Sequence, residues 1–326
     1  MNHVLITGGA GFIGSKLTEL LLENDNIKVT CLDNFDDFYS RRQKEWNIRA
    51  FNSKPNFKLV EGDIREAGSF YKIDNDVDAI VHLAAKAGVR PSIKNPVLYQ
   101  DVNIRGTQML LEYARLKSIK QFIFASSSSV YGINKNIPWR EDENLLPISP
   151  YAATKLSGEM LGHVYSQLYG IRFLALRFFT VYGPSQRPDL AIHKFFKSII
   201  NNQPIPVYGD GSTRRDYTYI DDVVKGIIAA MSYDKSAFEI INLGNNRTVT
   251  LAELITAIEN VCGKKAIINP RPEQPGDVPA TYADITKAKN LLDYEPTTRL
   301  EEGLTLFYNW FRNYADAMQL SPHHLQ

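Results

Sequence analysis

Short apolar runs alternate with longer segments of helical periodicity through the first half of the chain. Each run is almost continuously apolar, which is typical of parallel strands that are buried on both faces. Strands that alternate with helices predict β-α-β units and an α/β fold with a doubly wound parallel sheet. The predicted strands are His3 to Thr7, Ile27 to Leu32, Phe57 to Val60, Ala79 to Leu83, Gln121 to Ala125 and Phe173 to Phe178.

From about Val181 onward the pattern loosens, with loop signals such as Gly183-Pro184 and a proline-rich stretch from Pro270 to Pro279. This predicts a smaller C-terminal lobe that binds the substrate. The run Glu239 to Leu243 reads as one more strand that returns to the sheet, so we expect interleaved domains. The expected sheet domain is 1–179 plus about 218–244, and the expected lobe is about 180–217 and 245–326.

One helix has clear boundaries. Ser149 suits the N-cap, Pro150 suits the first helical position, and Gly170 suits the C-terminal stop. Tyr151 and Lys155 therefore fall in the first turns, four residues apart, on one face. A nearby ammonium favours the ionised phenol and lowers its pKa, so this pair predicts a general base for a substrate hydroxyl. A core tyrosine beside a solvated lysine is the alternative.

A glycine-rich turn follows the first predicted strand. Gly8, Gly11 and Gly14 come directly after it, and the helical pattern of Leu17 and Leu20 follows. Glycines allow the backbone to approach a diphosphate, whose charge is favourable at a helix N-terminus. The strand before and the helix after are the context that a Rossmann-like dinucleotide site requires. Phe12 and Ile13 lie inside the same turn.

Acidic residues at the ends of the next two strands extend this site. Asp33 follows the second strand, where an acid can accept hydrogen bonds from the adenosine ribose and repel a 2′-phosphate, which favours NAD over NADP. A strand-end turn residue is the alternative. Arg41 and Arg42 lie downstream and could soften the preference. Asp63, after the third strand, could reach the adenine amino group.

Small and hydroxyl residues follow the fourth and fifth strands. Leu83-Ala84-Ala85 would let the backbone approach the cofactor, and Ser126 to Gly132 brings several hydroxyls to the same edge of the sheet. A polar loop is the plain alternative for the serine run.

Composition narrows the class of protein. The chain has 326 residues with 37 basic and 36 acidic side chains, a net charge of +1, so no overall field favours nucleic acid or an anionic membrane. Cys31 and Cys262 lie far apart and lack metal-ligand spacing, so we expect no disulfide framework and no metal site. Without an evident signal peptide or membrane span, we expect a cytoplasmic enzyme.

Together these segments resemble the nucleotide-sugar branch of the extended short-chain dehydrogenase/reductases over nearly the whole chain. The resemblance rests on Gly8-x-x-Gly11-x-x-Gly14, Asp33, His82-Leu83-Ala84-Ala85, Ser126 to Gly132 and Tyr151-x-x-x-Lys155. It implies that Tyr151 takes the proton of a sugar hydroxyl and that Lys155 lowers the pKa of Tyr151 and holds the nicotinamide ribose. It also implies that Ser127 hydrogen-bonds the reacting oxygen. The expected cofactor residues are Gly8, Gly11, Phe12, Ile13, Gly14, Asp33, Asn34, Asp63, Ile64, Leu83, Ala84, Ala85 and Lys155.

Several segments are similar, more narrowly, to UDP-glucuronate 4-epimerases. They are Asp33 to Tyr39, Lys86 to Arg90, Arg177 to Pro184, Arg187 to Ala191 and Gln274 to Pro279. The resemblance implies that Thr180 and Arg187 lie near the sugar, that Arg215 and Arg271 grip the diphosphate, and that helices near Val97 to Leu116 and Pro150 to Tyr169 form a homodimer interface. The expected substrate residues are Arg90, Ser127, Ser128, Ser129, Tyr151, Thr180, Arg187, Val207, Tyr208, Arg215 and Arg271.

The predicted reaction is therefore NAD-dependent C4 epimerisation of a UDP-sugar through a 4-keto intermediate, with UDP-glucuronate preferred over UDP-glucose or UDP-GlcNAc. Arg187 supplies a guanidinium suited to a carboxylate, although a surface arginine is the alternative. Ser129 stands where dehydratases and decarboxylases of this branch carry an acid, which argues against both activities. Lys86 and Pro91 depart from the expected segment. A non-catalytic NAD-binding protein would not need Ser127, Tyr151 and Lys155.

Overall fold

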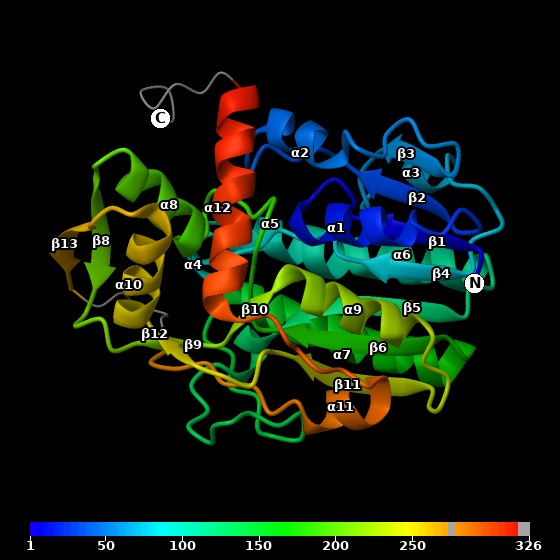
Figure 1. Cartoon of the computed structure of the whole chain (residues 1–326). Helices are drawn as coiled ribbons and strands as arrows, with labels where there is room; N and C mark the ends of the chain where they lie inside the picture. The colour runs from blue at the N-terminus through cyan, green and yellow to red at the C-terminus, as the bar shows by residue number, and fades with distance from the viewer. Residues whose placement is uncertain (273–277, 319–326) are drawn as a thin grey trace.

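Seven parallel strands form the central sheet of the computed structural model, which describes residues 1–272 and 278–318. The strand order in these residues is β11-β6-β5-β4-β1-β2-β3 (Figure 1). This confirms the doubly wound α/β fold predicted from the apolar runs. The strands are β1 (His3–Thr7), β2 (Lys28–Asp33), β3 (Phe57–Glu61), β4 (Ala79–His82), β5 (Gln121–Ser127), β6 (Arg172–Phe178) and β11 (Phe238–Leu243).

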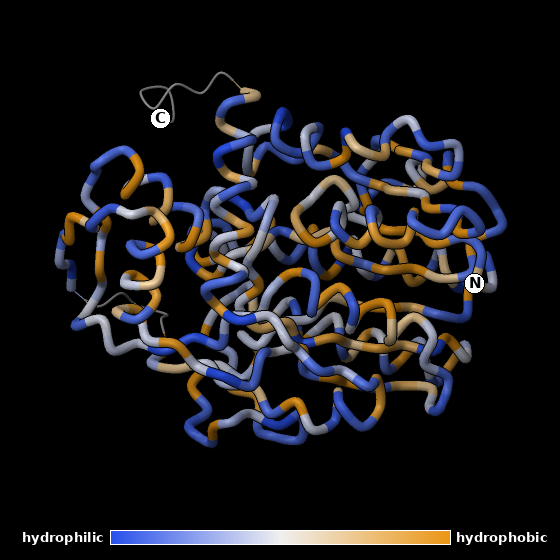
Figure 2. Tube along the Cα trace, in the orientation of Figure 1, coloured by the Kyte–Doolittle hydropathy of each residue, from blue (hydrophilic) through white to orange (hydrophobic). Residues whose placement is uncertain are grey.

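Alternate side chains along each strand enter two separate cores. Val4 and Ile6 of β1 join one hydrophobic cluster with helices α1 (Phe12–Leu21) and α9 (Ile220–Met231), whereas Leu5 joins a second cluster with α6 (Gly106–Leu116). The continuous apolar runs are thus explained by burial of both faces. The sheet strands are correspondingly hydrophobic in Figure 2.

Helix α7 (Pro150–Tyr169) packs closely on the sheet. Gly158 and Gly162 face Phe124 and Phe173, and a Cβ atom at Gly162 would lie 2.1 Å from the Phe173 ring. Its boundaries confirm the sequence prediction: the Ser149 side chain accepts a hydrogen bond from the Ala152 N–H, and Gly170 is left-handed with φ 63°. The remaining helices beside the sheet are α2 (Arg41–Ile48), α3 (Ala67–Phe70), α4 (Val89–Lys94), α5 (Pro96–Gln100), a π-helical turn (Asp101–Arg105) and α11 (Thr286–Leu292).

A smaller lobe lies to the left of the sheet in Figure 1. There α8 (Ala191–Ile200) and α10 (Leu251–Cys262) pack beside the parallel pair of β8 (Pro204–Tyr208) and β13 (Ile267–Arg271). Helix α12 (Leu300–Ala317) runs between this lobe and the sheet. Short connecting strands are β7 (Thr180–Tyr182), which pairs with β10 (Tyr217–Tyr219), and β9 (Arg214–Arg215), which pairs with β12 (Val249–Thr250).

The strand predicted at Glu239 to Leu243 is β11, which pairs with β6 at the edge of the sheet. Strand ends differ by a residue or two elsewhere: Asp33 is the last residue of β2 and does not follow it, and β5 continues to Ser127. The serine run then turns through a 3₁₀ helix, Ser128–Tyr131. No helix within the described ranges combines the length and apolarity needed to cross a bilayer.

Candidate active site

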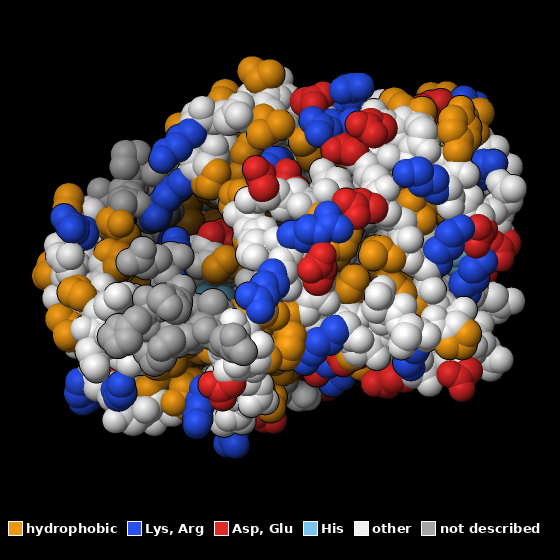
Figure 3. Space-filling model, turned by 90° about the horizontal axis from the view of Figure 1, so that it is seen from above, with side chains coloured by type: hydrophobic (Ala, Val, Ile, Leu, Met, Phe, Trp, Pro, Cys, Tyr) orange, Lys and Arg blue, Asp and Glu red, His pale blue; other side chains and the backbone are white. Residues whose placement is uncertain are grey.

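A cavity of about 500 Å³ opens at the carboxyl ends of the sheet strands and is walled on its other side by the small lobe. Figure 3 shows a recess between these two parts of the molecule, on a face where basic and acidic side chains are interspersed. Ligands of doubly wound sheets bind at this edge. All the residues predicted for the cofactor line the cavity, as do Ser127, Ser128, Ser129, Tyr151, Thr180, Arg187 and Arg215.

The glycine turn leaves the start of α1 open to the cavity. Gly8 has φ +72°, and a Cβ atom there would lie 2.8 Å from the backbone nitrogen of Ala84. At Gly14 a Cβ would lie 2.3 Å from the Gly8 carbonyl oxygen, so glycine permits both close approaches. Gly11 is the N-cap, and no side chain caps the helix or places an acid in its first turn. An uncapped helix N-terminus in a cavity fits a diphosphate.

Asp33 is buried at the end of β2 beside this turn. Its carboxylate accepts hydrogen bonds from the backbone N–H groups of Phe35 (2.8 Å) and Ala10 (3.1 Å). Burial raises its pKa, and the Lys44 ammonium, 3.8 Å away, opposes that shift. Lys44 is a cavity residue that the sequence reasoning missed, since one lysine in a polar helix gives no signal. Arg41 instead pairs with Glu61.

Asp63 also lines the cavity but already has partners. Arg65 donates to it (2.8 Å), Asn34 donates to it (2.9 Å), and the Arg65 hydrogen bond lowers the pKa of the Asp63 carboxyl to about 2. A carboxylate retains lone pairs for further donors, so the predicted contact with an adenine amino group stays a prediction.

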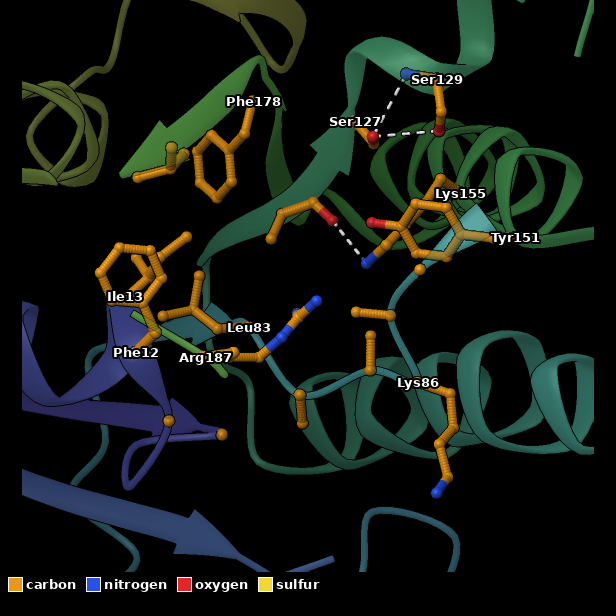
Figure 4. Close-up of a pocket in the computed structure, with 18 of the residues that line it drawn as sticks. Phe12, Ile13, Leu83, Lys86, Ser127, Ser129, Tyr151, Lys155, Phe178 and Arg187 are labelled. Carbon is orange, nitrogen blue, oxygen red and sulfur yellow. Dashed lines mark hydrogen bonds between the residues drawn. The ribbon is translucent and has the colours of Figure 1, made fainter. Parts of the chain in front are cut away.

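Tyr151, Lys155 and Ser127 meet inside the cavity (Figure 4). The Lys155 Nζ donates to the carbonyl oxygen of Ala125 (2.7 Å) and lies 5.9 Å from the centroid of the Tyr151 ring. The Ser127 side chain lowers the pKa of the Tyr151 phenol, and the Ser127 Oγ accepts from the Ser129 hydroxyl (3.0 Å). A phenol, an ammonium and a hydroxyl around one space can exchange a proton with a ligand hydroxyl.

The titration of this pair differs from the sequence prediction. Burial raises the pKa of Tyr151 above its usual value, while the Ser127 hydrogen bond and the charge of Arg187 lower it. Lys155 does not produce the expected net lowering. Burial instead lowers the pKa of Lys155 to about 7, opposed by the charge of Glu159. The physical reason is desolvation, which disfavours the charged form of both groups and outweighs their attraction.

A buried ion pair that the sequence reasoning missed joins α7, the helix of Tyr151 and Lys155, to the sheet. Arg177 of β6 donates to Glu159 of α7 through Nε (2.9 Å) and Nη2 (2.8 Å), and both side chains are almost fully buried. Ser126 also donates to Glu159. Glu159 is one helical turn beyond Lys155, a spacing that could have signalled it.

Thr180 and Arg187 approach the same space from the small lobe. Arg187 donates to Asp189 through Nε (2.9 Å) and Nη2 (3.0 Å), which leaves Nη1 for a ligand. Figure 4 shows its guanidinium directed toward Tyr151 and Lys155. Arg187 is therefore a cavity residue and not the surface arginine that the sequence left open. Arg215, also on the cavity wall, is the last residue of β9.

Four predicted substrate residues lie outside the cavity lining. Arg90 sits over the Tyr208 ring, 5.2 Å from its centroid, and Arg271 is exposed at the end of β13. Val207 is buried in the hydrophobic core, so only its backbone is available to a ligand. The segment Gln274 to Asp277, which contributed to the resemblance, lies outside the described residues.

Two aromatic residues after β2 complete the cavity wall without having been singled out in the sequence. Phe38 lies between cations, with Arg187 5.5 Å from its ring centroid. The buried Tyr39 hydroxyl has no hydrogen-bond partner among the described residues, and it is 3.8 Å from where a Cβ of Gly11 would be. No cluster of three or more metal-ligating side chains occurs in the part of the chain that the structure describes.

Comparisons with known proteins show that this chain is similar to enzymes that act on nucleotide sugars. The model of the GDP-mannose 4,6 dehydratase family matches residues 5–307. The UDP-glucuronate 4-epimerase of Thermodesulfobacterium geofontis is 41% identical over 314 residues, which cover 95% of this chain and 96% of that protein.

Solved structures of epimerases are similar over almost their whole length. The crystal structure of UDP-glucuronic acid 4-epimerase from Bacillus cereus, in complex with UDP-glucuronic acid and NAD, has a TM-score of 0.91 and 40% identity and covers 96% of this chain and 99% of that chain. The UDP-N-acetylglucosamine 4-epimerase of Methanobrevibacter ruminantium has a TM-score of 0.89 and 33% identity, with the same coverage.

Replacement of Lys155 by methionine tests the buried charge. In the wild type, the pKa of Lys155 is about 7 when folded and near 10.5 when unfolded, so the unfolded state binds more protons between these values. Wild-type stability should rise with pH across that window, by at most about 1.4 kcal/mol per pH unit. We expect K155M to lack this rise in urea unfolding at pH 7, 8 and 9, whereas K58M, at an exposed ion pair, should keep it. An unchanged slope in K155M would refute the assignment.

Proposed function

The chain belongs to the nucleotide-sugar branch of the extended short-chain dehydrogenase/reductases and, within it, to the family of UDP-glucuronate 4-epimerases; from this premise we propose that it is an isomerase that converts UDP-glucuronate to UDP-galacturonate. The observation that carries the choice of substrate is Arg187, a partly buried guanidinium that faces Tyr151 inside the cavity. A cation there matches a sugar whose C6 is a carboxylate.

The cofactor is NAD, held by the residues at the strand ends. The open N-terminus of α1 would hold the diphosphate, and Asp33 would accept hydrogen bonds from the adenosine ribose. When bound, NAD supplies a reversible hydride acceptor for C4 of the sugar. Lys155 lies deep enough in the cavity to hold the nicotinamide ribose as well as to face Tyr151.

Proton transfer at the C4 hydroxyl is the task of the chain's own residues. The phenolate of Tyr151, formed against its raised pKa, would remove this proton while bound NAD would supply the acceptor for the C4 hydride, so that a 4-keto sugar would result. Ser127 would donate a hydrogen bond to the same oxygen as its bond order changes. After the sugar has turned about its diphosphate link, Tyr151 would return the proton to the C4 oxygen and the hydride would return to the opposite face of C4. No net oxidation or reduction occurs.

The keto intermediate of a glucuronate must also be protected from decarboxylation. Its C4 ketone is β to the C6 carboxylate, and carbon dioxide leaves when the C5–C6 bond aligns with the carbonyl π system. Arg187, Thr180 and the hydroxyls of the Ser127 to Ser129 turn surround this end of the cavity. We propose that these side chains hold the carboxylate so that the C5–C6 bond does not reach that alignment. The reaction is then controlled by the orientation of the intermediate.

Alternative reactions fit the cavity less well. Dehydration needs a base for the C5 proton, and the acids among the described lining residues, Asp33, Asp36 and Asp63, all lie at or just after the ends of β2 and β3, in the cofactor half. Ser129 offers a hydroxyl instead of an acid. A neutral-hexose epimerase would have no use for Arg187. A protein that only binds NAD would need neither Ser127 nor Tyr151.

We further propose a cytoplasmic location, because Cys31 and Cys262 are both free thiols, as is usual in a reducing compartment. The sheet domain would hold NAD, and the small lobe, with Arg215 and the more distant Arg271, would face the UDP-sugar, together with Arg90 from the sheet domain. The boundaries 1–179 plus 218–244, and 180–217 plus 245–326, remain our proposal for these two units.

The product identifies the reaction. We expect the purified protein with NAD to convert UDP-glucuronate to the axial C4 epimer, UDP-galacturonate, as followed by proton NMR, and to convert UDP-glucose much more slowly. Appearance of UDP-xylose would show that the keto acid loses carbon dioxide. The protein would then be a decarboxylase and not an epimerase. Equal rates on UDP-glucose and UDP-glucuronate would show that Arg187 does not select for the carboxylate.

Replacement of Arg187 by glutamine tests carboxylate recognition. Loss of a partly buried charge-assisted hydrogen bond should lower kcat/KM for UDP-glucuronate by about 100-fold. The affinity for UDP alone, measured by calorimetry, should change by less than about twofold because UDP has no carboxylate. The matched control is R312Q, on the exposed side of α12. Wild-type kinetics in R187Q would contradict the assignment.

We also propose a homodimer. Met160, Val164 and Leu168 of α7 are spaced by four residues and are 49%, 44% and 66% exposed, and Val97 and Leu116 of the neighbouring helical segment are exposed as well. An apolar stripe along one helix face is suited to pairing with its own copy.

Charge placed in this stripe should separate the subunits. We expect V164D/L168D to elute as a 36.9 kDa monomer in size-exclusion chromatography with light scattering, whereas the wild type should have twice that mass. The control L306D changes an exposed leucine on α12 and should stay dimeric. Circular dichroism establishes that the variants are folded. A monomeric wild type would overturn the dimer.

A further inference from the structure

An ion pair joins two loops that lie on opposite sides of the glycine turn. The Lys86 ammonium, after β4, donates to the Asp36 carboxylate, after β2, at 2.7 Å. The side chains are 15% and 29% exposed, so the pair is partly shielded from solvent. Lys86 is also one of the residues that departs from the sequence pattern of the family segment.

The strand order determines what this pair crosses. β1 lies between β4 and β2, and the three strands are parallel. Residues that follow β4 and β2 can therefore meet only by passing beside or over the carboxyl end of β1, where the Gly8 to Gly14 turn begins. This is the edge of the sheet at which a dinucleotide diphosphate binds.

Lys86 is fixed to the catalytic helix. Its N–H donates to the side chain of Asn103 (2.8 Å), and the Asn103 amide donates back to the Lys86 carbonyl (3.0 Å) and to the hydroxyl of Thr154 (3.0 Å). Thr154 precedes Lys155 in α7. Figure 4 shows the Lys86 side chain running away from Tyr151, so Lys86 does not take part in the proton transfer.

Asp36 organises the loop on the other side. Its carboxylate accepts from the Phe38 N–H (3.0 Å) as well as from Lys86, and its carbonyl accepts from Lys44 (2.9 Å). The Phe38 ring is near two cations, since Lys86 lies 6.0 Å and Arg187 lies 5.5 Å from its centroid. The next residue is Tyr39, whose buried hydroxyl has no partner among the described residues.

We propose that Lys86 is a positioning residue whose ion pair with Asp36 forms a clasp across the cofactor cleft, which retains NAD during turnover and sets Phe38 against Arg187. The proposal rests on the proposed function in that the site binds NAD. An epimerase returns the hydride to the sugar from which it came. If the reduced cofactor left between the two half-reactions, the keto sugar could not be reduced and the turnover would not be completed. The clasp supplies that retention.

The exchange rate of bound NAD tests the clasp on the holoenzyme. Protein loaded with NAD is mixed with an excess of radiolabelled NAD, without sugar, and samples are filtered over time. We expect D36N and K86M each to accelerate exchange by about fivefold, as for loss of one partly shielded ion pair. The double variant should match the single variants, because both remove the same interaction. K86R should restore slow exchange.

Matched controls are K58M and D74N, which break an ion pair of similar length on the surface and should leave exchange unchanged. A second measurement separates positioning from general loosening of the fold: with UDP-glucuronate, the clasp variants should release more 4-keto sugar per turnover than the wild type, and the controls should not.

Two outcomes would overturn the clasp. Unchanged exchange in both single variants would show that the pair does not retain NAD. Faster NAD exchange in K86M with unchanged or slower exchange in D36N would show that Lys86 contacts the cofactor directly. Asp36 would then only compete with the cofactor for the Lys86 ammonium. Because exchange is measured without sugar, a protein inactive on UDP-glucuronate would disprove the proposed function while leaving this result interpretable.

Discussion

The buried ion pair between Glu159 and Arg177 is the interaction on which the site depends. It joins α7, which carries Tyr151 and Lys155, to β6, and through Ser126 it reaches β5 just before Ser127. Removing one partner of such a pair leaves an uncompensated buried charge, at a cost of about 3–5 kcal/mol. A helix packed only by apolar contacts could slide by a fraction of an ångström. Two parallel hydrogen bonds to one carboxylate fix it in register with the serine turn.

This anchoring holds the ionisable side chains of Tyr151 and Lys155 in a site that is largely shielded from water. Burial works against the charged forms of both Tyr151 and Lys155, and it is opposed by Ser127 and Arg187 for the phenol and by Glu159 for the ammonium. The groups are thus poised so that a bound cation or anion changes which of them is charged. Arg187 also contributes, since it lines the cavity near Tyr151 and its charge lowers the pKa of the phenol.

Most of the fold could be predicted from the sequence because its signals are local. Continuous apolar runs gave strands within one or two residues, and Ser149, Pro150 and Gly170 gave the boundaries of α7. The cavity residues of the glycine turn could be predicted for the same reason. Lys44 and Tyr39 could not, because a buried charge or an unpartnered hydroxyl is defined by residues distant in sequence. Glu159 had a local signal in its spacing from Lys155, but its burial against Arg177 had none. Desolvation of Lys155 is likewise invisible before packing is known.

The proposed recognition of the sugar and the proposed retention of the cofactor meet at Phe38. Lys86 lies 6.0 Å and Arg187 lies 5.5 Å from the centroid of its ring. An aromatic ring attracts each cation near it, so a displacement of Arg187 would change the surroundings of Phe38. On the proposed function, a carboxylate that draws Arg187 away from Asp189 would therefore also affect the loop that carries Asp36 and Phe38. Binding of the sugar and retention of the cofactor would then be coupled, which is what a reaction with a labile keto acid intermediate requires.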